Sequence, residues 1–235
     1  MAVKKLNSKL VQVFFLSILS SVLVPVHAAD LSQLSGQDAN AGLKAALEQG
    51  ANAALSKLGV QGGFLNNEKV RIPLPSILEK TKPILKLSGQ SKQLDELVVS
   101  MNRAAESAVP MAKPLLIDAV KSMSIADAKA ILGGGDTSVT QFFKEKTAKP
   151  LSVKFMPIVK GVTDKVGLAG KYNGVMEKAK KLGAVSEQEA TVEAYVSSRA
   201  VDALYLMIAE EEKAIRKDPL GTGSKIIGKV FGLLK

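Results

Sequence analysis

The residue types that most often carry catalysis are nearly absent from this chain. It contains no Cys, and its one histidine, His27, lies in the N-terminal segment. Without imidazole and thiol groups the rest of the chain cannot build a His-based triad, a cysteine nucleophile or a His/Cys zinc site. Ser-x-x-Lys and Gly-x-Ser-x-Gly motifs are also missing. We therefore expect no cofactor and no metal site.

Carboxylates remain as groups that could do chemistry. Glu210, Glu211 and Glu212 are consecutive, so on a helix they point about 100° apart and cannot all line one site. Ion pairs with the basic residues that follow explain them. A glycosidase needs two carboxyl groups about 5–10 Å apart across a cleft. The spacing in the sequence cannot exclude such a pair, so a carboxylate-dependent cell-wall hydrolase stays open as an alternative.

A polar group at Asn102, Arg103 and Glu106 is the first candidate binding site. On a helix, Asn102 and Glu106 share a face, and Arg103 is placed to pair with Glu106. Apolar residues flank the group. It is interpreted either as a surface ion pair beside the core or as a cluster that holds another segment or a ligand head group.

The second candidate is a basic stretch from Lys144 to Lys181, with ten lysines against three acidic residues. Its lysines lack the interleaved aromatic residues of a single-strand nucleic-acid binder, so no nucleic-acid partner is expected. Anionic lipid, lipopolysaccharide or an acidic envelope protein are the expected partners, and solvated lysine faces are the alternative. The binding residues predicted in this stretch are Lys154, Lys160, Lys165 and Lys171.

A glycine run, Gly133 to Gly135, precedes Asp136 and Thr137. It is interpreted as a turn in which Asp136 or Thr137 caps the next helix. The alternative is an anion held by bare amide groups at that helix start.

The N-terminus predicts export. Lys4, Lys5 and Lys9 precede an apolar run that ends at Pro25, and small residues follow up to Ala28. This order predicts a signal peptide over 1–28, with an uncleaved membrane anchor as the alternative. The expected location is outside the cytoplasm. Residues 29–235 contain no second long apolar run, so no transmembrane segment is expected there. The sequence gives no indication of the oligomeric state.

Outside residues 59–75, apolar residues recur at helical spacing from Leu43 onward, and no useful alternating β pattern exists. We predict one all-α domain over 29–235, a bundle of seven to nine helices, with irregular residues 59–75 as a strap. A capping box of Ser186 and Glu189 predicts a long central helix from Ser186 to Lys217, the longest of the bundle. Proline positions predict two separate helices near 137–148 and 150–166.

Several ordered motifs resemble a known family. These are Gly63-Phe64-Leu65-Asn66-Asn67, Ile72-Pro73-Leu74-Pro75, Met101-Asn102-Arg103-Ala104-Ala105-Glu106, Asp127-Ala128-Lys129-Ala130-Ile131-Leu132, Leu206-Met207-Ile208-Ala209-Glu210-Glu211-Glu212-Lys213 and Asp218-Pro219. In this order they resemble the domain of unknown function family numbered 4197, exported proteins of Gram-negative bacteria. The resemblance covers roughly residues 30 to 232. It implies an α-helical periplasmic protein and supplies no activity and no catalytic residues.

The sequence thus favours a non-enzymatic binding or envelope-associated protein for an anionic or lipid-like partner. Two alternatives remain open beside it: the cell-wall hydrolase, and a carrier that encloses an apolar ligand in an internal cavity. Many aliphatic and few aromatic residues suit such a cavity, but they suit an ordinary core equally well.

Overall fold

The computed structural model describes residues 36–181 and 185–232, and all regular elements in these ranges are helical. The predicted all-α fold is confirmed. The predicted signal peptide over 1–28 lies outside the described residues. The helices are α1 (Gly36–Leu58), α2 (Ser76–Leu87), α3 (Ser91–Ala108), α4 (Lys113–Lys121), α5 (Ile125–Leu132), α6 (Ser138–Thr163), α7 (Gly167–Lys181), α8 (Val192–Lys217) and α9 (Lys225–Gly232), with 3-10 turns at Val109–Ala112, Glu187–Glu189 and Leu220–Thr222.

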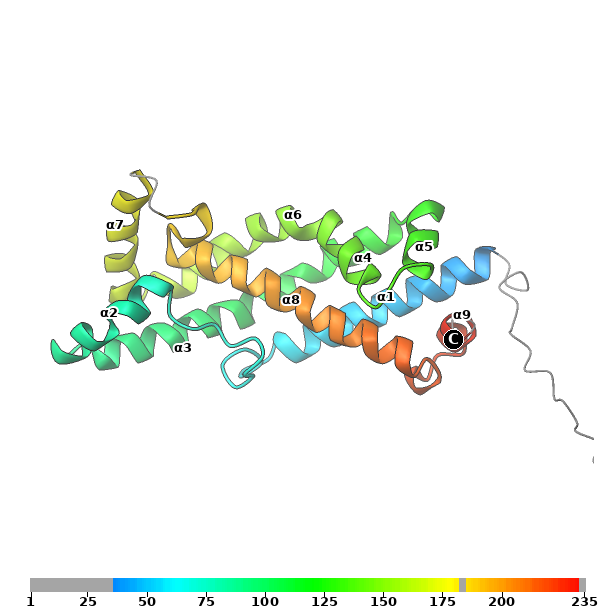
Figure 1. The fold of residues 1–235 in the computed structure, drawn as a ribbon, viewed down its shortest axis with the longest axis horizontal. Coiled ribbons are helices and arrows are strands. Elements are labelled where there is room, and N and C mark those ends of the chain that lie inside the picture. The colour runs from blue at the N-terminus through cyan, green and yellow to red at the C-terminus, as the bar shows by residue number, and fades with distance from the viewer. Residues whose placement is uncertain (1–35, 182–184, 233–235) are drawn as a thin grey trace, which may run out of the picture.

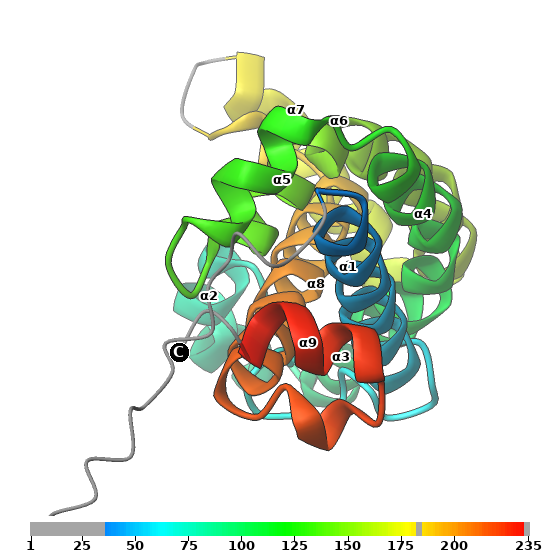
Figure 2. The ribbon, with the colours of Figure 1, turned by 90° about the vertical axis from the view of Figure 1, so that its right-hand side faces the viewer.

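Helix α8 runs through the middle of an elongated bundle and packs against α6, α1 and α3 (Figure 1). Its buried positions, which include Val196, Ala200, Leu204 and Ile208, recur at intervals of four. This spacing places one apolar stripe toward the core. Viewed along the bundle, α9 lies across the end of α1 (Figure 2), against which it packs. The prediction of a central helix is correct, although α6 has the same length of 26 residues.

Helix α6 corrects the prediction of two helices in this region. It continues through both Pro150 and Pro157. Each proline removes one backbone hydrogen bond and crowds the preceding turn. The residues Phe143, Thr147, Leu151, Phe155 and Val159, spaced four apart, are all buried. The free energy gained by burying the side chains of Phe143, Leu151 and Phe155 outweighs the free-energy cost of the two prolines in the helix.

The start of α8 corrects a second boundary. Residues Glu187–Glu189 form a separate 3-10 turn, and the helix begins at Val192. Thr191 is its N-cap, because its hydroxyl accepts a hydrogen bond from the Ala194 N–H at 3.0 Å. The predicted capping box of Ser186 and Glu189 makes only a side-chain contact of 3.4 Å. In contrast, Ser124 and Asp127 form a complete capping box at the start of α5.

The strap, residues 59–75, leads from the end of α1 to α2 (Figure 1). It begins with a tight turn in which Gly62 has φ of +90°, a conformation that other residues rarely adopt. Phe64, Ile72 and Leu74 of the strap are buried. The strap therefore belongs to the core, and its polar backbone groups need partners there.

Candidate functional site

Asn102 on α3 supplies partners for the strap. It is fully buried, and its Oδ1 accepts a hydrogen bond from the Ile72 N–H at 2.9 Å. Its Nδ2 donates to the Ile72 carbonyl at 2.9 Å and to the Val98 carbonyl at 2.8 Å. The side-chain amide thus pairs with the strap as a neighbouring strand would, and both of its Nδ2 hydrogens are used.

Glu106, one turn further along α3, holds the start of the strap. Its Oε1 accepts hydrogen bonds from the Phe64 and Leu65 N–H groups, both at 3.1 Å, and Arg103 Nη1 lies 2.6 Å from its Oε2. Burial alone raises the pKa of Glu106, but the hydrogen bonds from Arg103 and the strap together outweigh it and lower the pKa. The predicted group at Asn102, Arg103 and Glu106 therefore holds another segment of the same chain.

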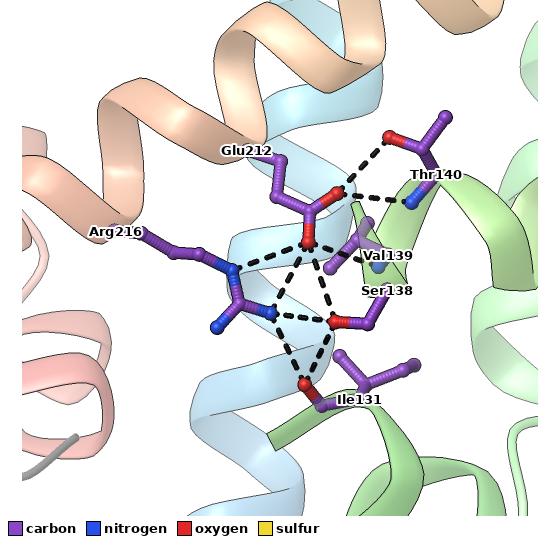
Figure 3. A network of polar contacts seen from close by, with 6 residues as sticks. All are labelled: Ile131, Ser138, Val139, Thr140, Glu212 and Arg216. Atoms are coloured by element: carbon purple, nitrogen blue, oxygen red, sulfur yellow. Dashed lines mark hydrogen bonds and ion pairs between the residues drawn. The ribbon is translucent and has the colours of Figure 1, made fainter. Parts of the chain in front are cut away.

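A second cluster joins α8 to the start of α6 (Figure 3). Its ion pair between Glu212 and the following Arg216 agrees with the sequence prediction, but its link to α6 was not predicted. Glu212 is buried, and its two oxygens accept hydrogen bonds from the Val139 and Thr140 N–H groups, both at 3.0 Å. Arg216 Nη2 donates to Glu212 Oε1 at 3.1 Å and to the Ile131 carbonyl at 3.1 Å. The ion pair therefore serves the open carbonyl end of α5 and the open N–H end of α6 together.

This cluster shows which group caps the start of α6 after the glycine run. Thr137 stands at the N-cap position of α6 but makes no side-chain capping bond, so the predicted cap by Asp136 or Thr137 is wrong. The alternative of an anion at that helix start is met by this chain's own Glu212 carboxylate. The neighbouring glutamates point elsewhere, as expected for consecutive helical residues: Glu210 pairs with Lys69 and Glu211 with Lys57, and neither partner follows in sequence.

A third buried carboxylate, Glu193, lies at the other end of α8. It accepts hydrogen bonds from Thr163 Oγ1 of α6 at 3.2 Å and from Asn173 Nδ2 of α7 at 2.9 Å. Asn173 Oδ1 in turn accepts from the Val192 N–H at 2.8 Å. The cluster ties three helices together. Glu193 and Glu212 both fall on the apolar stripe of α8, and this position was the signal in the sequence that could have revealed them.

The predicted lysines gather only in part. α2, α7 and the end of α6 lie together at one end of the long axis (Figure 1), which we call the basic end. Lys160, Lys165 and Lys171 belong to it, whereas Lys154 lies in the middle of α6 and is half-buried. The Asp164 carboxylate, 2.7 Å away, raises the pKa of Lys160. The basic end also includes Lys80, Lys82 and Lys86 of α2.

Most of these lysines are free of acidic neighbours. Lys82 pairs with Glu79 at 3.3 Å and Lys160 with Asp164. Within the described ranges no ion pair forms at Lys80, Lys86, Lys165 or Lys171, and all four are exposed.

Aliphatic side chains are exposed among these lysines. Ile84 is 68% and Leu87 90% exposed, and Val175 of α7 is 60% exposed. Ile77, Lys80, Ile84 and Leu87 fall within about 80° of the circumference of α2. Leu78 and Leu85 lie on another face, where Leu78 is buried and Leu85 packs against the core. Helix α2 therefore has a second apolar stripe that nothing in the described chain covers.

Two open grooves and one small pocket bear on the alternatives. The pocket between α1 and α8, lined by Leu47, Ile208 and Phe231 among others, has a volume of about 10 Å³. This is room for about one water molecule, so it lends nothing to the apolar-carrier hypothesis. The grooves, of about 280 and 450 Å³, each contain one carboxylate, Asp202 or Glu187. Neither groove offers the facing pair that a glycosidase needs.

In the part of the chain that the structure describes, no three acidic, His or Cys residues are grouped as metal ligands. Likewise, none of the described helices is both long and apolar enough for a membrane span.

The fold and its clusters define an all-α protein whose buried carboxylates join helices and hold a strap. Comparison with known families agrees with the motifs in the sequence. Residues 33–232 match the family described as "Protein of unknown function (DUF4197)", and the chain belongs to that family. No curated protein and no solved structure matches it.

Proposed function

We propose that this protein is an exported, non-enzymatic envelope protein that attaches its basic end to an anionic lipid surface. The observation that carries the proposal is the mixture of unpaired lysines and exposed aliphatic side chains on α2 and α7. Lysines attract anionic head groups, and each contributes about 1 kcal/mol near such a surface. The aliphatic side chains lie where they would enter the boundary between head groups and acyl chains.

The geometry of α2 favours a surface attachment over a solvated lysine face. Lys80 lies within the same stripe as Ile77, Ile84 and Leu87, so one face presents both charge and apolar area. Leu87 at 90% and Ile84 at 68% exposure lie on this one face, so they form an apolar patch and are not single exposed residues. On α6 the exposed Val153 and Met156 follow Lys149 by one and two turns, outside the basic end, so the lysines of that helix serve as a comparison.

Co-sedimentation with vesicles tests the proposal. Vesicles of phosphatidylcholine alone, with phosphatidylglycerol, and with lipopolysaccharide are compared at low and high salt. We expect binding to the phosphatidylglycerol vesicles that weakens with salt. Equal, negligible binding to all compositions would refute the proposal, and binding only to the lipopolysaccharide vesicles would replace phospholipid by lipopolysaccharide as the partner.

Matched variants locate the attachment. K80Q/K171Q removes one unpaired lysine from each helix of the basic end and is expected to weaken binding roughly 30-fold at low salt. K144Q/K149Q removes the same charge from exposed positions in the first half of α6. If the control pair weakened binding as much, the attraction would be a property of net charge and not of this end.

A third variant separates insertion from attraction. I84S/L87S leaves the charge unchanged, and its loss of affinity should be similar at low and high salt because burial of apolar area is not screened. Unchanged affinity would remove the insertion part of the proposal.

The compartment is tested separately by the intact mass of protein recovered from its host. Cleavage after Ala28 predicts a chain that begins at Ala29. A membrane-bound chain that begins at Met1 would favour the uncleaved anchor.

A further inference from the structure

A groove between the strap and α8 has no role in the architecture described above. Its volume is about 280 Å³. One wall is the strap segment from Lys69 to Pro73, and the other is formed by Arg199, Asp202, Ala203 and Leu206 of α8. The groove does not include α2 or α7, so it is distinct from the basic end.

The groove has two guanidinium groups that form no ion pair among the described residues. Arg71 comes from the strap and Arg199 from α8, and both are exposed. Among the described residues no carboxylate is in ion-pair contact with either arginine. The third cation, Lys69, is neutralised by Glu210 at 2.5 Å. The one acidic residue of the groove itself is Asp202, and it forms no ion pair within the described chain.

The apolar part of the groove lies beside these charges. Val70, Ile72 and Ala203 are buried, while Leu206 is 43% exposed. An apolar wall next to two guanidinium groups suits a molecule with an anionic head and a short apolar body. A bare inorganic anion would leave that wall wet.

Both walls are held in place before any ligand arrives. Asn102 fixes both backbone groups of Ile72, and the Tyr195 hydroxyl donates to the Pro73 carbonyl at 3.2 Å. The Arg199 guanidinium stacks on the Tyr195 ring, 5.3 Å from its centroid. A preformed site loses less conformational entropy on binding. The buried polar contacts of the strap thus also fix the wall that carries Arg71, while Arg199 belongs to the other wall.

We propose that this groove is a binding site for a small amphipathic anion, with a phosphate or carboxylate head between Arg71 and Arg199. Planar guanidinium groups bind such heads through paired hydrogen bonds, which an ammonium group cannot reproduce. The apolar body of the ligand lies along Leu206 and the edge of Val70. This site does not depend on the vesicle binding of the basic end.

Isothermal titration calorimetry with three probes tests the head and the body separately. Hexyl phosphate is expected to bind. Inorganic phosphate should bind at least tenfold more weakly because it lacks the apolar body, and hexanol should not bind measurably because it lacks the anionic head. Absence of hexyl phosphate binding, or equal binding of hexanol, would overturn the proposal.

Variants assign the contacts. R71A and R199A should each weaken hexyl phosphate binding at least tenfold. R71K/R199K keeps both charges but should also weaken it, because the paired geometry is lost. L206S should lower the affinity for hexyl phosphate and leave that for inorganic phosphate unchanged. K144A/K149A, which removes two exposed cations from α6, is the control and should bind as the wild type does.

Asp202 provides a test in the opposite direction. D202N removes the one negative charge of the groove and should strengthen hexyl phosphate binding roughly two- to fivefold at low salt. The variant changes an exposed residue without a partner, so the fold should not change. Weaker binding in D202N, or loss of affinity in the K144A/K149A control equal to that in R71A, would refute the assignment.

Discussion

Helix α8 has a buried glutamate near each end, and the two are bonded differently. Glu212 has a cationic partner in Arg216 and caps the start of α6. Among the residues that the structure describes, Glu193 receives hydrogen bonds only from the neutral groups of Thr163 and Asn173. Both carboxylates are about equally hidden from solvent. The difference therefore lies in their partners and not in their burial.

The comparison shows two ways in which a carboxylate can be kept in a protein interior. At Glu212 an ion pair and two helix termini of opposite polarity compensate one another. At Glu193 neutral donors and the N-terminus of its own helix share the compensation. At Glu212, removal of the carboxylate charge leaves the Arg216 charge without its partner. At Glu193 it leaves only neutral groups, which can rearrange.

The largest effect is expected for E212Q. The substitution removes the charge that faces Arg216, whose side chain is 13% exposed, and turns an amide N–H group toward the start of α6. Loss of one partner from a buried ion pair costs about 3 kcal/mol or more. Urea denaturation followed by circular dichroism should show a corresponding decrease in the free energy of unfolding.

A double-mutant cycle with R216M checks the cause. If the pair acts as a unit, E212Q/R216M should be less destabilised than the sum of the two single variants, by about 1 kcal/mol or more. Additive effects would mean that Glu212 acts as a cap of α6 alone.

Glu106 is an intermediate case, and E106Q should cost about 2 kcal/mol at neutral pH. Its partner Arg103 is partly exposed, so water compensates part of the lost charge. The lowered pKa means that the folded state holds its proton less tightly than the unfolded state. The contribution of Glu106 is therefore complete above the ordinary pKa of glutamate, about 4.3, and is lost as the pH falls through the lower folded value.

The pH dependence gives this prediction its control. The stability difference between wild type and E106Q should shrink on acidification below about pH 4. E79Q changes an exposed glutamate of α2 and should show no comparable trend. A difference that stayed constant from pH 7 to pH 3 would contradict the role of the charged form.

The fold could be predicted from the sequence because it depends on local signals. Apolar spacing predicted helices, and the structure confirms the all-α fold. The failures arose where tertiary contacts prevail. Burial of Phe143, Leu151 and Phe155 carries α6 through two prolines, and Glu212 caps α6 from 72 residues away in sequence. A search for capping residues near residue 137 could not find that partner.

The candidate site shows the same division. The pairing of Arg103 with Glu106 follows from their spacing of three residues, and it is present. No local sequence signal predicts the groove lined by Arg71 and Arg199, because its two walls are more than 120 residues apart in sequence. They come together only when the strap folds against α8. The lysines of α6 and α7 looked like one basic stretch, yet Lys154 lies apart from the others because helical rotation and the turn before α7 separate them.

The smallest effect is expected for E193Q, at about 1 kcal/mol or less. Glutamine keeps one oxygen for Asn173 or Thr163, and the Thr163 hydroxyl can rotate to the group that remains. Relief from burying a charge offsets part of the lost bonding. N173A, by contrast, removes the acceptor of the Val192 N–H and leaves Glu193 with Thr163 alone, so it should cost more than E193Q. Urea denaturation of both variants beside E212Q tests this difference. If E193Q were as destabilising as E212Q, Glu193 would depend on a cation such as Lys160, whose pKa is raised first by Asp164 and also by Glu193. The distinction between the two ends of α8 would then be wrong.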